Sequence, residues 1–413
     1  MKANMAQSKK PSLWIASELY YPELTSTGYI LTRIAEELSS YFNVGVICGQ
    51  PSYSERGTQS PQRETHNDVD IHRCWATTLN KDVLLFRLVN ILTITMSIFL
   101  TSLRHFSQGD HVLVVTNPPS LPFAVTLACK IRGAKCSLIV HDIYPDVAIA
   151  SGKLLPDSML AKFLSWLNIK LYRSMQRIFV LGRDMQDMVA EQLDIHRDRV
   201  VIATNWADLD LVVPTPRHKN ALLCQLGITD KFVLLYAGNM GYPNDIESII
   251  EAAIQLQQQR DIHFLFIGSG AKQKQLELAV SRESLSNVTL LDQQSRSKQS
   301  DFLNACDVAL ISLVAGMKGV SVPSRTYNVL ASGKPIIGIV EDGTELALVI
   351  EEEGVGWIVP PGQPGKLVTM ILEAKSQPEL LHDMGLRARH AAEKKYTFQR
   401  VVQVFRNSLQ VTI

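Results

Sequence analysis

One pattern repeats along the 413 residues of the chain: short runs of apolar, often β-branched residues alternate with stretches of helical periodicity. Such apolar runs are typical of strands covered on both faces, and the helices between them indicate that the strands are parallel. The pattern stops near residue 205 and restarts near residue 232. The runs are SLWIAS (12–17), VGVICG (44–49), HVLVVT (111–116), CSLIVHD (136–142), RIFVLG (177–182), VVIATN (200–205), FVLLYAG (232–238), IHFLFIG (262–268), NVTLLD (287–292), DVALIS (307–312) and KPIIGIV (334–340).

The interruption divides the chain into two α/β units. A chain of this length also exceeds what one hydrophobic core usually organises. We expect a Rossmann-like, doubly wound domain over residues 1–212, a second over 213–390 and a closing helix over 391–413. Open parallel sheets bind ligands at the carboxyl ends of their strands. Two such sheets facing each other therefore place the functional site in the cleft between the domains.

Charge and cysteine content exclude several classes of protein. The 41 lysines and arginines balance the 40 aspartates and glutamates, so no global field draws the chain to nucleic acid. The six scattered cysteines lack the spacing of a zinc site. The polar N-terminus, MKANMAQSKKPS, lacks the apolar region of a secretory signal. We expect a cytoplasmic protein with no nucleic-acid partner.

Two helical segments of the first domain have the composition of membrane contacts. The uncharged stretch Leu88 to Leu103 is shorter than the roughly 20 apolar residues of a spanning helix, so residues 84–103 either lie in the membrane interface or cover the sheet. Over residues 159–177, helical periodicity separates an apolar face from a basic one. The apolar face comprises Leu160, Leu164, Leu167, Leu171 and Met175, and the basic face comprises Lys162, Trp166, Lys170, Arg173 and Arg177. The basic face is either solvated or in contact with anionic lipid at the inner surface of the cell membrane.

The segment VPSRTYNVLASGKPIIG (322–338) predicts a short helix followed by a strand. Ser324 is a candidate N-cap behind Pro323, and Gly333 ends the helix. The unpaired amides of a helix N-terminus and the cationic fork of Arg325 suit a diphosphate. An ordinary capped helix with a solvated arginine is the alternative.

With six further segments, this motif resembles the retaining glycosyltransferases of family four, and within them the bacterial enzymes that decorate lipid-linked sugars. The resemblance covers almost the whole chain. The segments are ELYYPELTSTGYILTRIAEELS (18–39), TNPPSLP (116–122), IVHDIYPD (139–146), NWADLD (205–210), LLYAGNMGYPNDIESIIEA (234–252) and FIGSGAKQKQLE (266–277).

The resemblance implies the α/β GT-B architecture, in which two Rossmann-like domains face an interdomain cleft. The implied reaction moves a hexose from a UDP- or GDP-linked donor to an acceptor, with retention of anomeric configuration. The implied acceptor is a polyprenyl-diphosphate-linked saccharide in exopolysaccharide, capsule or O-antigen synthesis.

Strand-to-helix turns carry the glycines that the resemblance assigns to donor binding. Small residues at such a turn let the backbone approach a phosphate or a sugar, although a tight turn alone also explains them. The resemblance assigns donor or nucleotide contacts to Gly28 in the first domain and to Gly238, Asn239, Gly241, Gly268 and Gly270 in the second, besides Ser324, Arg325 and Asn328.

The chain departs from the family pattern at two places. Many members have two glutamates separated by seven residues, where this chain has Val320 and Asn328. Asn328 can bond ribose hydroxyls, but Val320 cannot bond the donor sugar, which leaves the amides of residues 319–322 as candidates. A basic residue often follows the Gly238 turn in the family, where residues 242–244 are Tyr-Pro-Asn. Arg325 is then expected to carry more of the phosphate charge.

His141 and Asp142 end an apolar run, which places them at the carboxyl edge of the first sheet. A lone histidine is often structural, but the family has an active-site histidine in this neighbourhood. We expect His141 to contact the donor sugar or to polarise the acceptor, with Asp142 orienting it. The family mechanism lets the departing phosphate oxygen deprotonate the acceptor hydroxyl, so it requires no pair of catalytic carboxylates.

No metal or other cofactor is expected. Two Asp-x-Asp triplets, at residues 68–70 and 208–210, do not follow an apolar strand beside a nucleotide pocket, so we interpret both as structural. Two alternative functions stay open. A nucleotide-sugar epimerase of the same shape would need no acceptor, and a non-catalytic nucleotide-binding partner in polysaccharide assembly is compatible with the missing glutamates.

Overall fold

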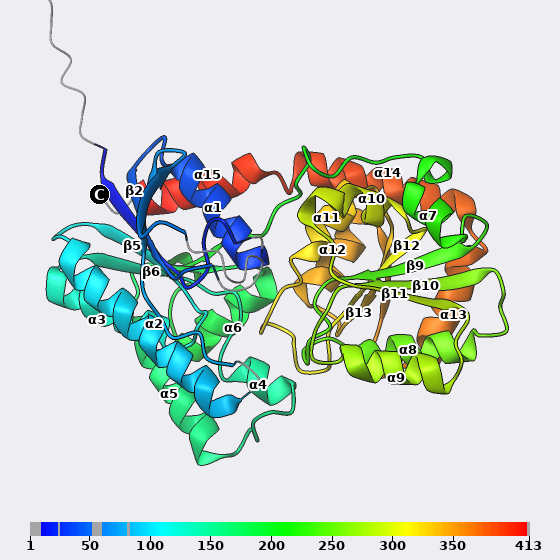
Figure 1. Cartoon of the computed structure of the whole chain (residues 1–413), viewed down its shortest axis with the longest axis horizontal. Helices are drawn as coiled ribbons and strands as arrows, with labels where there is room; N and C mark the ends of the chain where they lie inside the picture. Colours follow the sequence, from blue (N-terminus) through cyan, green and yellow to red (C-terminus); the bar gives the residue numbers. More distant parts are fainter. Residues whose placement is uncertain (1–9, 24, 52–59, 81–82, 411–413) are drawn as a thin grey trace, which may run out of the picture.

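A computed structural model describes residues 10–23, 25–51, 60–80 and 83–410. They form two domains, each built around one sheet with helices on both faces (Figure 1). In the first sheet all neighbouring strands are parallel except β3 and β4. Across that sheet the order is β3 (Arg63–His66), β4 (Val69–Arg73), β2 (Asn43–Cys48), β1 (Ser12–Ala16), β5 (His111–Val115), β6 (Lys135–Ile139), β7 (Ile178–Val180) and β8 (Val200–Ile202).

The second sheet is parallel throughout. Its strand order is β11 (Val288–Leu291), β10 (Ile262–Ile267), β9 (Phe232–Ala237), β12 (Val308–Ser312), β13 (Ile336–Ile339) and β14 (Gly356–Val359). Its helices are α7 (Ala221–Leu226), α8 (Ile246–Gln255), α9 (Gln273–Arg282), α10 (Gln299–Asn304), α11 (Arg325–Ala331), α12 (Glu345–Glu353), α13 (Pro364–Lys375) and α14 (Pro378–Lys394).

Both faces of the first sheet are buried, and successive residues of a central strand point to opposite faces. In β5, Val112 and Val114 pack with one helical layer, whereas Leu113 and Val115 pack with the other. The first layer comprises α2 (Leu84–His105), α3 (Leu121–Arg132), α4 (Asp146–Ala150), α5 (Met159–Arg173) and α6 (Arg183–Leu193). The opposite layer comprises α1 (Ser26–Leu38) and α15 (Phe398–Gln410), which lie side by side in Figure 1.

The chain crosses between the domains twice, and the two crossings lie together. After α14 it returns to the first domain, where Phe405 of α15 packs on Phe179 with ring centroids 4.6 Å apart. At the crossing, the amide of Ala207 donates to the carbonyl of Tyr396 over 2.8 Å. The paired crossings fix the C-terminal helix to the first domain.

Several helices and strands differ from what the sequence predicted. The apolar helix α2 is longer than expected, and its part Leu85–His105 is long and apolar enough to cross a membrane by length and composition alone. Helix α5 ends at Arg173, so Arg177 lies beyond it. Leu160, expected on the buried face of α5, is 56% exposed. The strands β3 and β14 were not expected, because β3 (RETH) contains no apolar run and the apolar run of β14 (GWIV) is only four residues long.

Candidate functional site

Each sheet has one point at which the strand order reverses, between β1 and β5 in the first and between β9 and β12 in the second. Loops leave such a point in opposite directions and open a crevice at the carboxyl ends of the strands. Gly28 follows β1, Gly238 follows β9, and the loop ahead of Arg325 follows β12. Predicted residues therefore lie at both reversal points, whereas the Gly268 turn follows the neighbouring strand β10 and His141 follows β6.

Direct contacts join the two reversal points across the cleft. The hydroxyl oxygens of Ser26 and Ser324 lie 3.2 Å apart, which brings the start of α1 to the start of α11. Asp142 forms an antiparallel bridge with Ser321, and the next amide, of Ile143, donates to a second-domain carbonyl over 3.0 Å. The structure thus brings the first turn of α1, which contains Gly28, to the loop of His141 and the start of α11 at Arg325.

The guanidinium of Arg325 is fixed by acceptors of its own domain. It donates to the carbonyl of Ala237 over 3.3 Å and to the Asn244 side-chain oxygen over 2.6 Å. It also lies over the ring of Tyr236, 4.6 Å from its centroid. These two bonds use two of the five N–H donors of a guanidinium, so the group is held in place with donors in reserve. The sequence pointed to Arg325 but not to Asn244, whose side chain is in turn held by the carbonyl of Asn239 over 3.1 Å.

The glycine turns of the second domain pack directly on one another. Gly238 and Gly268 both have φ of +143°, and a Cβ on Gly268 would lie 2.1 Å from the carbonyl oxygen of Gly238. A Cβ on Gly270 would lie 2.5 Å from the backbone of Met240. The packing of one turn on the other therefore requires glycine at 268 and 270, whether or not a ligand is bound. A Cβ on Gly238 would meet Arg325 Nη1 at 2.8 Å, so this turn lies against the arginine.

Asn239 and Gly241 belong to the same turn. The carbonyl of Asn239 accepts from the hydroxyl of Tyr236 over 2.8 Å. A Cβ on Gly241 would lie 3.0 Å from the Asn239 side-chain nitrogen. Both residues thus shape the loop next to Arg325.

In the predicted donor-binding segment, the structure differs from two of the expected roles. Ser324 precedes α11, but its side chain does not cap the helix. Among the candidate sugar-binding amides, that of Gly319 donates to Asp184 Oδ2 over 3.0 Å and that of Val320 to the carbonyl of Met317 over 3.0 Å. These two amides are therefore already used, and the expectation that they bind the donor sugar is wrong for this conformation.

Asn328 holds the interdomain crossing. Its side-chain oxygen accepts from the amide of Asp208 over 2.8 Å, while the Asp208 carboxylate accepts from the hydroxyl of Tyr29. Burial raises the pKa of Tyr29 to about 12, so this hydroxyl stays a donor at neutral pH. A ribose hydroxyl could still bond the amide nitrogen of Asn328 or the second lone pair of its oxygen.

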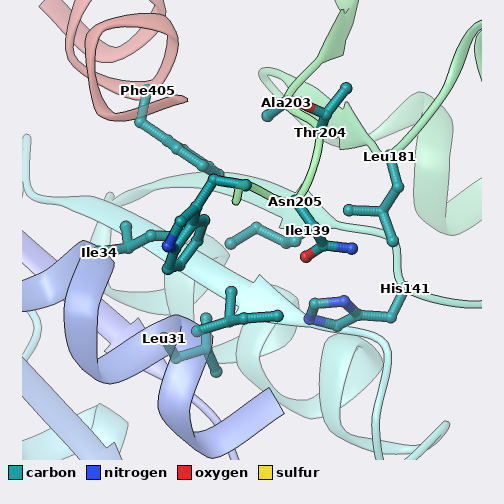
Figure 2. A pocket seen from close by; sticks show the side chains of 11 residues that line it. Leu31, Ile34, Ile139, His141, Leu181, Ala203, Thr204, Asn205 and Phe405 are labelled. Carbon is teal, nitrogen blue, oxygen red and sulfur yellow. The ribbon is translucent and has the colours of Figure 1, made fainter. Parts of the chain in front are cut away.

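His141 lies at the end of β6, as expected. Its Nε2 atom is buried and has no hydrogen-bond partner in the described part of the chain. The ring borders a small cavity of about 10 Å³, which holds about one water molecule. Figure 2 shows the ring facing the side chain of Asn205 across this cavity. Burial lowers the pKa of His141, and the charge of Asp142 opposes this only in part.

Asp142 does not orient the ring through a hydrogen bond within the described residues, so this expected role is wrong. Its carboxylate acts on His141 through charge alone. The backbone of Asp142 instead joins the two domains, because it forms the bridge to Ser321 across the cleft.

An ion-pair network between the domains had no clear signal in the sequence. Arg183 at the start of α6 donates to Glu345 at the start of α12, with 3.0 Å between Nε and Oε2. It also pairs with Glu352 over 2.5 Å. Glu345 is only 4% exposed, and burial raises its pKa while Arg183 opposes that change. The network closes the cleft on the side of Asp184 and Gly319.

The Asp-x-Asp triplets have structural environments. Asp70 accepts a 2.8 Å bond from Thr65 across the β3–β4 hairpin, and Asp208 lies in the contact with Tyr29. Among the described residues, no group of three or more histidine, cysteine or acidic side chains could hold a metal ion.

Comparison with known proteins assigns both halves of the chain. The Glycosyl transferase 4-like domain matches residues 27–206, and the Glycosyl transferases group 1 domain matches residues 222–391. WbjE of Pseudomonas aeruginosa, assigned as a glycosyltransferase, is 35% identical over 64% of this chain and 66% of its own length. WcaI of Escherichia coli K12, assigned to colanic acid biosynthesis, is 24% identical over 95% of this chain and 98% of its own length.

A solved structure has the same two-domain arrangement. HepE of Anabaena, solved with UDP-glucose, aligns over 97% of this chain and 99% of its own, with a TM-score of 0.71 and 14% identity. At this identity the likeness concerns the fold, which is GT-B. With each half matched to one domain of the same enzyme type, the chain belongs to the family-four glycosyltransferases.

Proposed function

We propose that the protein transfers a hexose, with retention of configuration, from a nucleoside-diphosphate donor to a saccharide acceptor in bacterial polysaccharide synthesis. The observation that carries the proposal is the bridge between Asp142 and Ser321. It joins the strand end of His141 to the loop of Arg325, so a donor bound at the arginine would have its sugar beside the first domain. The polysaccharide role is supported by the assignment of WcaI.

The donor diphosphate would bind at Arg325 and the Gly238 turn. The guanidinium is already oriented by Ala237 and Asn244, so little side-chain freedom is lost on binding. A fixed cation with free N–H donors stabilises the charge that develops on the departing diphosphate. UDP-glucose bound to HepE favours a uridine donor, and a GDP-linked donor is the alternative.

In the proposed transfer, the bond between the anomeric carbon and the phosphate oxygen breaks as the acceptor oxygen bonds to that carbon on the same face. The acceptor proton passes to the departing phosphate oxygen, and the products are a nucleoside diphosphate and a glycoside. No side chain has to take this proton. The residues of the cleft position the reactants and exclude water, and His141, kept neutral by its lowered pKa, can hydrogen-bond without adding charge.

We propose a lipid-linked saccharide as acceptor, with the enzyme at the inner face of the cell membrane. The support is the apolar and basic character of the helices α2 and α5 of the first domain. Such helices suit a protein that reaches an acceptor anchored in a bilayer.

A donor screen followed by a transfer assay tests the proposal. Thermal shift with UDP, GDP and their sugar conjugates identifies the donor, because a ligand that binds only the folded state raises stability with the logarithm of its concentration over its Kd. Labelled donor is then incubated with extracted lipid-linked saccharides, and the anomeric configuration of the product is read by NMR. We expect transfer with retention. Conversion of the donor sugar without acceptor would indicate an epimerase, and nucleotide binding without turnover would indicate a non-catalytic partner.

A further inference from the structure

The outward face of α2 is apolar along the length of the helix. Leu85, Leu88, Leu92, Met96 and Leu100 are all exposed, between 46% and 66%. They recur every three or four residues and so form one stripe. Only 17% of its 18-residue apolar stretch is buried. Water-exposed stripes of this size are unusual on soluble proteins and mark contact surfaces.

The neighbouring helices carry further exposed apolar residues. In Figure 1, α2, α3 and α5 lie next to one another on one face of the first domain. We call the exposed apolar residues of the three helices the lateral surface. Besides the α2 stripe it comprises Phe86, Leu127, Ile131, Met159, Leu160, Phe163 and Trp166.

The charge of these helices has one sign. They contain 22, 12 and 15 residues and include seven lysines and arginines but no aspartate or glutamate, although 40 of the 413 residues of the chain are acidic. Lys170 lies 3.8 Å from the ring centroid of Trp166, and both are exposed. An apolar stripe edged by cations and an exposed tryptophan matches the interface of an anionic bilayer.

We propose that the lateral surface docks on an anionic lipid bilayer, with α2 lying in the plane of the interface. The inward side of α2 is fixed to the domain by buried Ile94 and Ile98 and by polar contacts, including a 2.8 Å bond between Thr95 and Ser120. These contacts keep the helix on the domain, so it lies on the membrane and does not cross it. A nucleic acid would not cover an apolar stripe, and a second copy of this chain would bring seven like charges together.

The lateral surface also ends at the cleft. Arg87, in the first turn of α2, is close enough to Tyr144 for its charge to oppose the rise in pKa, to about 12, that burial causes in that hydroxyl. Asn168 of α5 donates to the carbonyl of the same tyrosine. Tyr144 lies three residues after His141. The docking surface deepens the proposed function. The docking itself rests on the helices alone, and only its use in reaching an acceptor rests on the proposed lipid-linked saccharide.

Vesicle co-sedimentation of the full chain tests the docking surface. Vesicles of phosphatidylcholine are compared with vesicles containing phosphatidylglycerol, at low and high salt. An apolar variant carries Leu88→Gln, Leu92→Gln and Met96→Gln, and its control carries Leu278→Gln, Leu372→Gln and Leu386→Gln on exposed positions of the second domain. A basic variant carries Lys162→Gln and Lys170→Gln, and its control carries Lys274→Gln and Lys366→Gln.

We expect binding to the anionic vesicles only, weakened about tenfold or more in the apolar variant. The basic variant should bind about fivefold more weakly for each cation removed, and high salt should abolish the difference. Both controls should bind like wild type. Equal binding by wild type and apolar variant, or none by wild type at low salt, would overturn the proposal. So would a wild-type dimer in light scattering that the apolar variant converts to a monomer, since the stripe would then join two copies.

A second measurement tests the proposed transferase function independently of membrane docking. Thermal shift by nucleotides is measured on the same variants, and it should be unchanged because their substitutions lie outside the cleft. Vesicle binding without any nucleotide response would contradict the proposed function and leave the docking surface intact.

Discussion

Replacing Arg325 by alanine should weaken the binding of UDP or GDP by about tenfold to about a hundredfold. A charge-assisted hydrogen bond is worth roughly 1.5 to 3 kcal/mol, and about 1.4 kcal/mol corresponds to a factor of ten. The bonds of Arg325 to Ala237 and Asn244 exist without a ligand. Their loss therefore affects the free and bound protein alike and largely cancels from the affinity. The change in affinity reports the contact with phosphate.

Isothermal titration at low salt measures this effect, after circular dichroism has shown that the variant is folded. Arg325→Lys keeps the charge but loses the planar fork, so its affinity should fall between those of wild type and alanine variant. Arg282→Ala is the matched control, because that arginine belongs to the same domain and its side chain is 77% exposed. Affinity within about twofold of wild type in Arg325→Ala, a difference below about 0.5 kcal/mol, would refute the placement of the diphosphate at this arginine.

His141→Asn should lower kcat by about a hundredfold or more and leave nucleotide affinity unchanged; equal kcat would make the residue structural. Because burial lowers the pKa of His141, its contribution to stability is complete above the unfolded value of about 6.5 and is lost as the pH falls through the folded value. Urea unfolding below about pH 6.5 should therefore show a steeper loss in wild type than in the variant. Arg183→Gln should cost about 3 kcal/mol by leaving buried Glu345 without a cation, and adding Glu345→Gln should restore part of it; strictly additive costs would contradict the pairing. Gly268→Ala should destabilise the second domain and abolish nucleotide binding, because its Cβ would lie 2.1 Å from a carbonyl oxygen, whereas Gly365→Ala, with open space around it, should do neither.

Apolar runs predicted most strands of both sheets, because each buried strand needs a continuous apolar segment and the restart near residue 232 is visible in the sequence. Arg325 could be singled out because the residues that follow it form a helix ended by a glycine turn. The glycines at 268 and 270 were recognisable because they lie between an apolar run and a helical segment. What they contact was not, since the packing of one turn on another depends on the strand order.

The contacts between the domains could not be predicted, because they join residues far apart in sequence. Asn328 has the chemistry of a ribose ligand, yet its oxygen accepts from the amide of Asp208, 120 residues away. In the sequence, Arg183 and Glu345 are ordinary charged residues at helix starts. They lie 162 residues apart, and only the fold brings them together. The exposure of Leu160 was also misjudged, since helical periodicity locates an apolar face but not the layer that covers it.

A crystal structure of the protein with UDP bound tests the central claim most directly. The account predicts the diphosphate within hydrogen-bonding distance of the Arg325 guanidinium, against the Gly238 turn, with its terminal phosphate towards the bridge of Asp142 and Ser321. A nucleotide bound at any other place, with the Arg325 side chain still held only by Ala237 and Asn244, would contradict it.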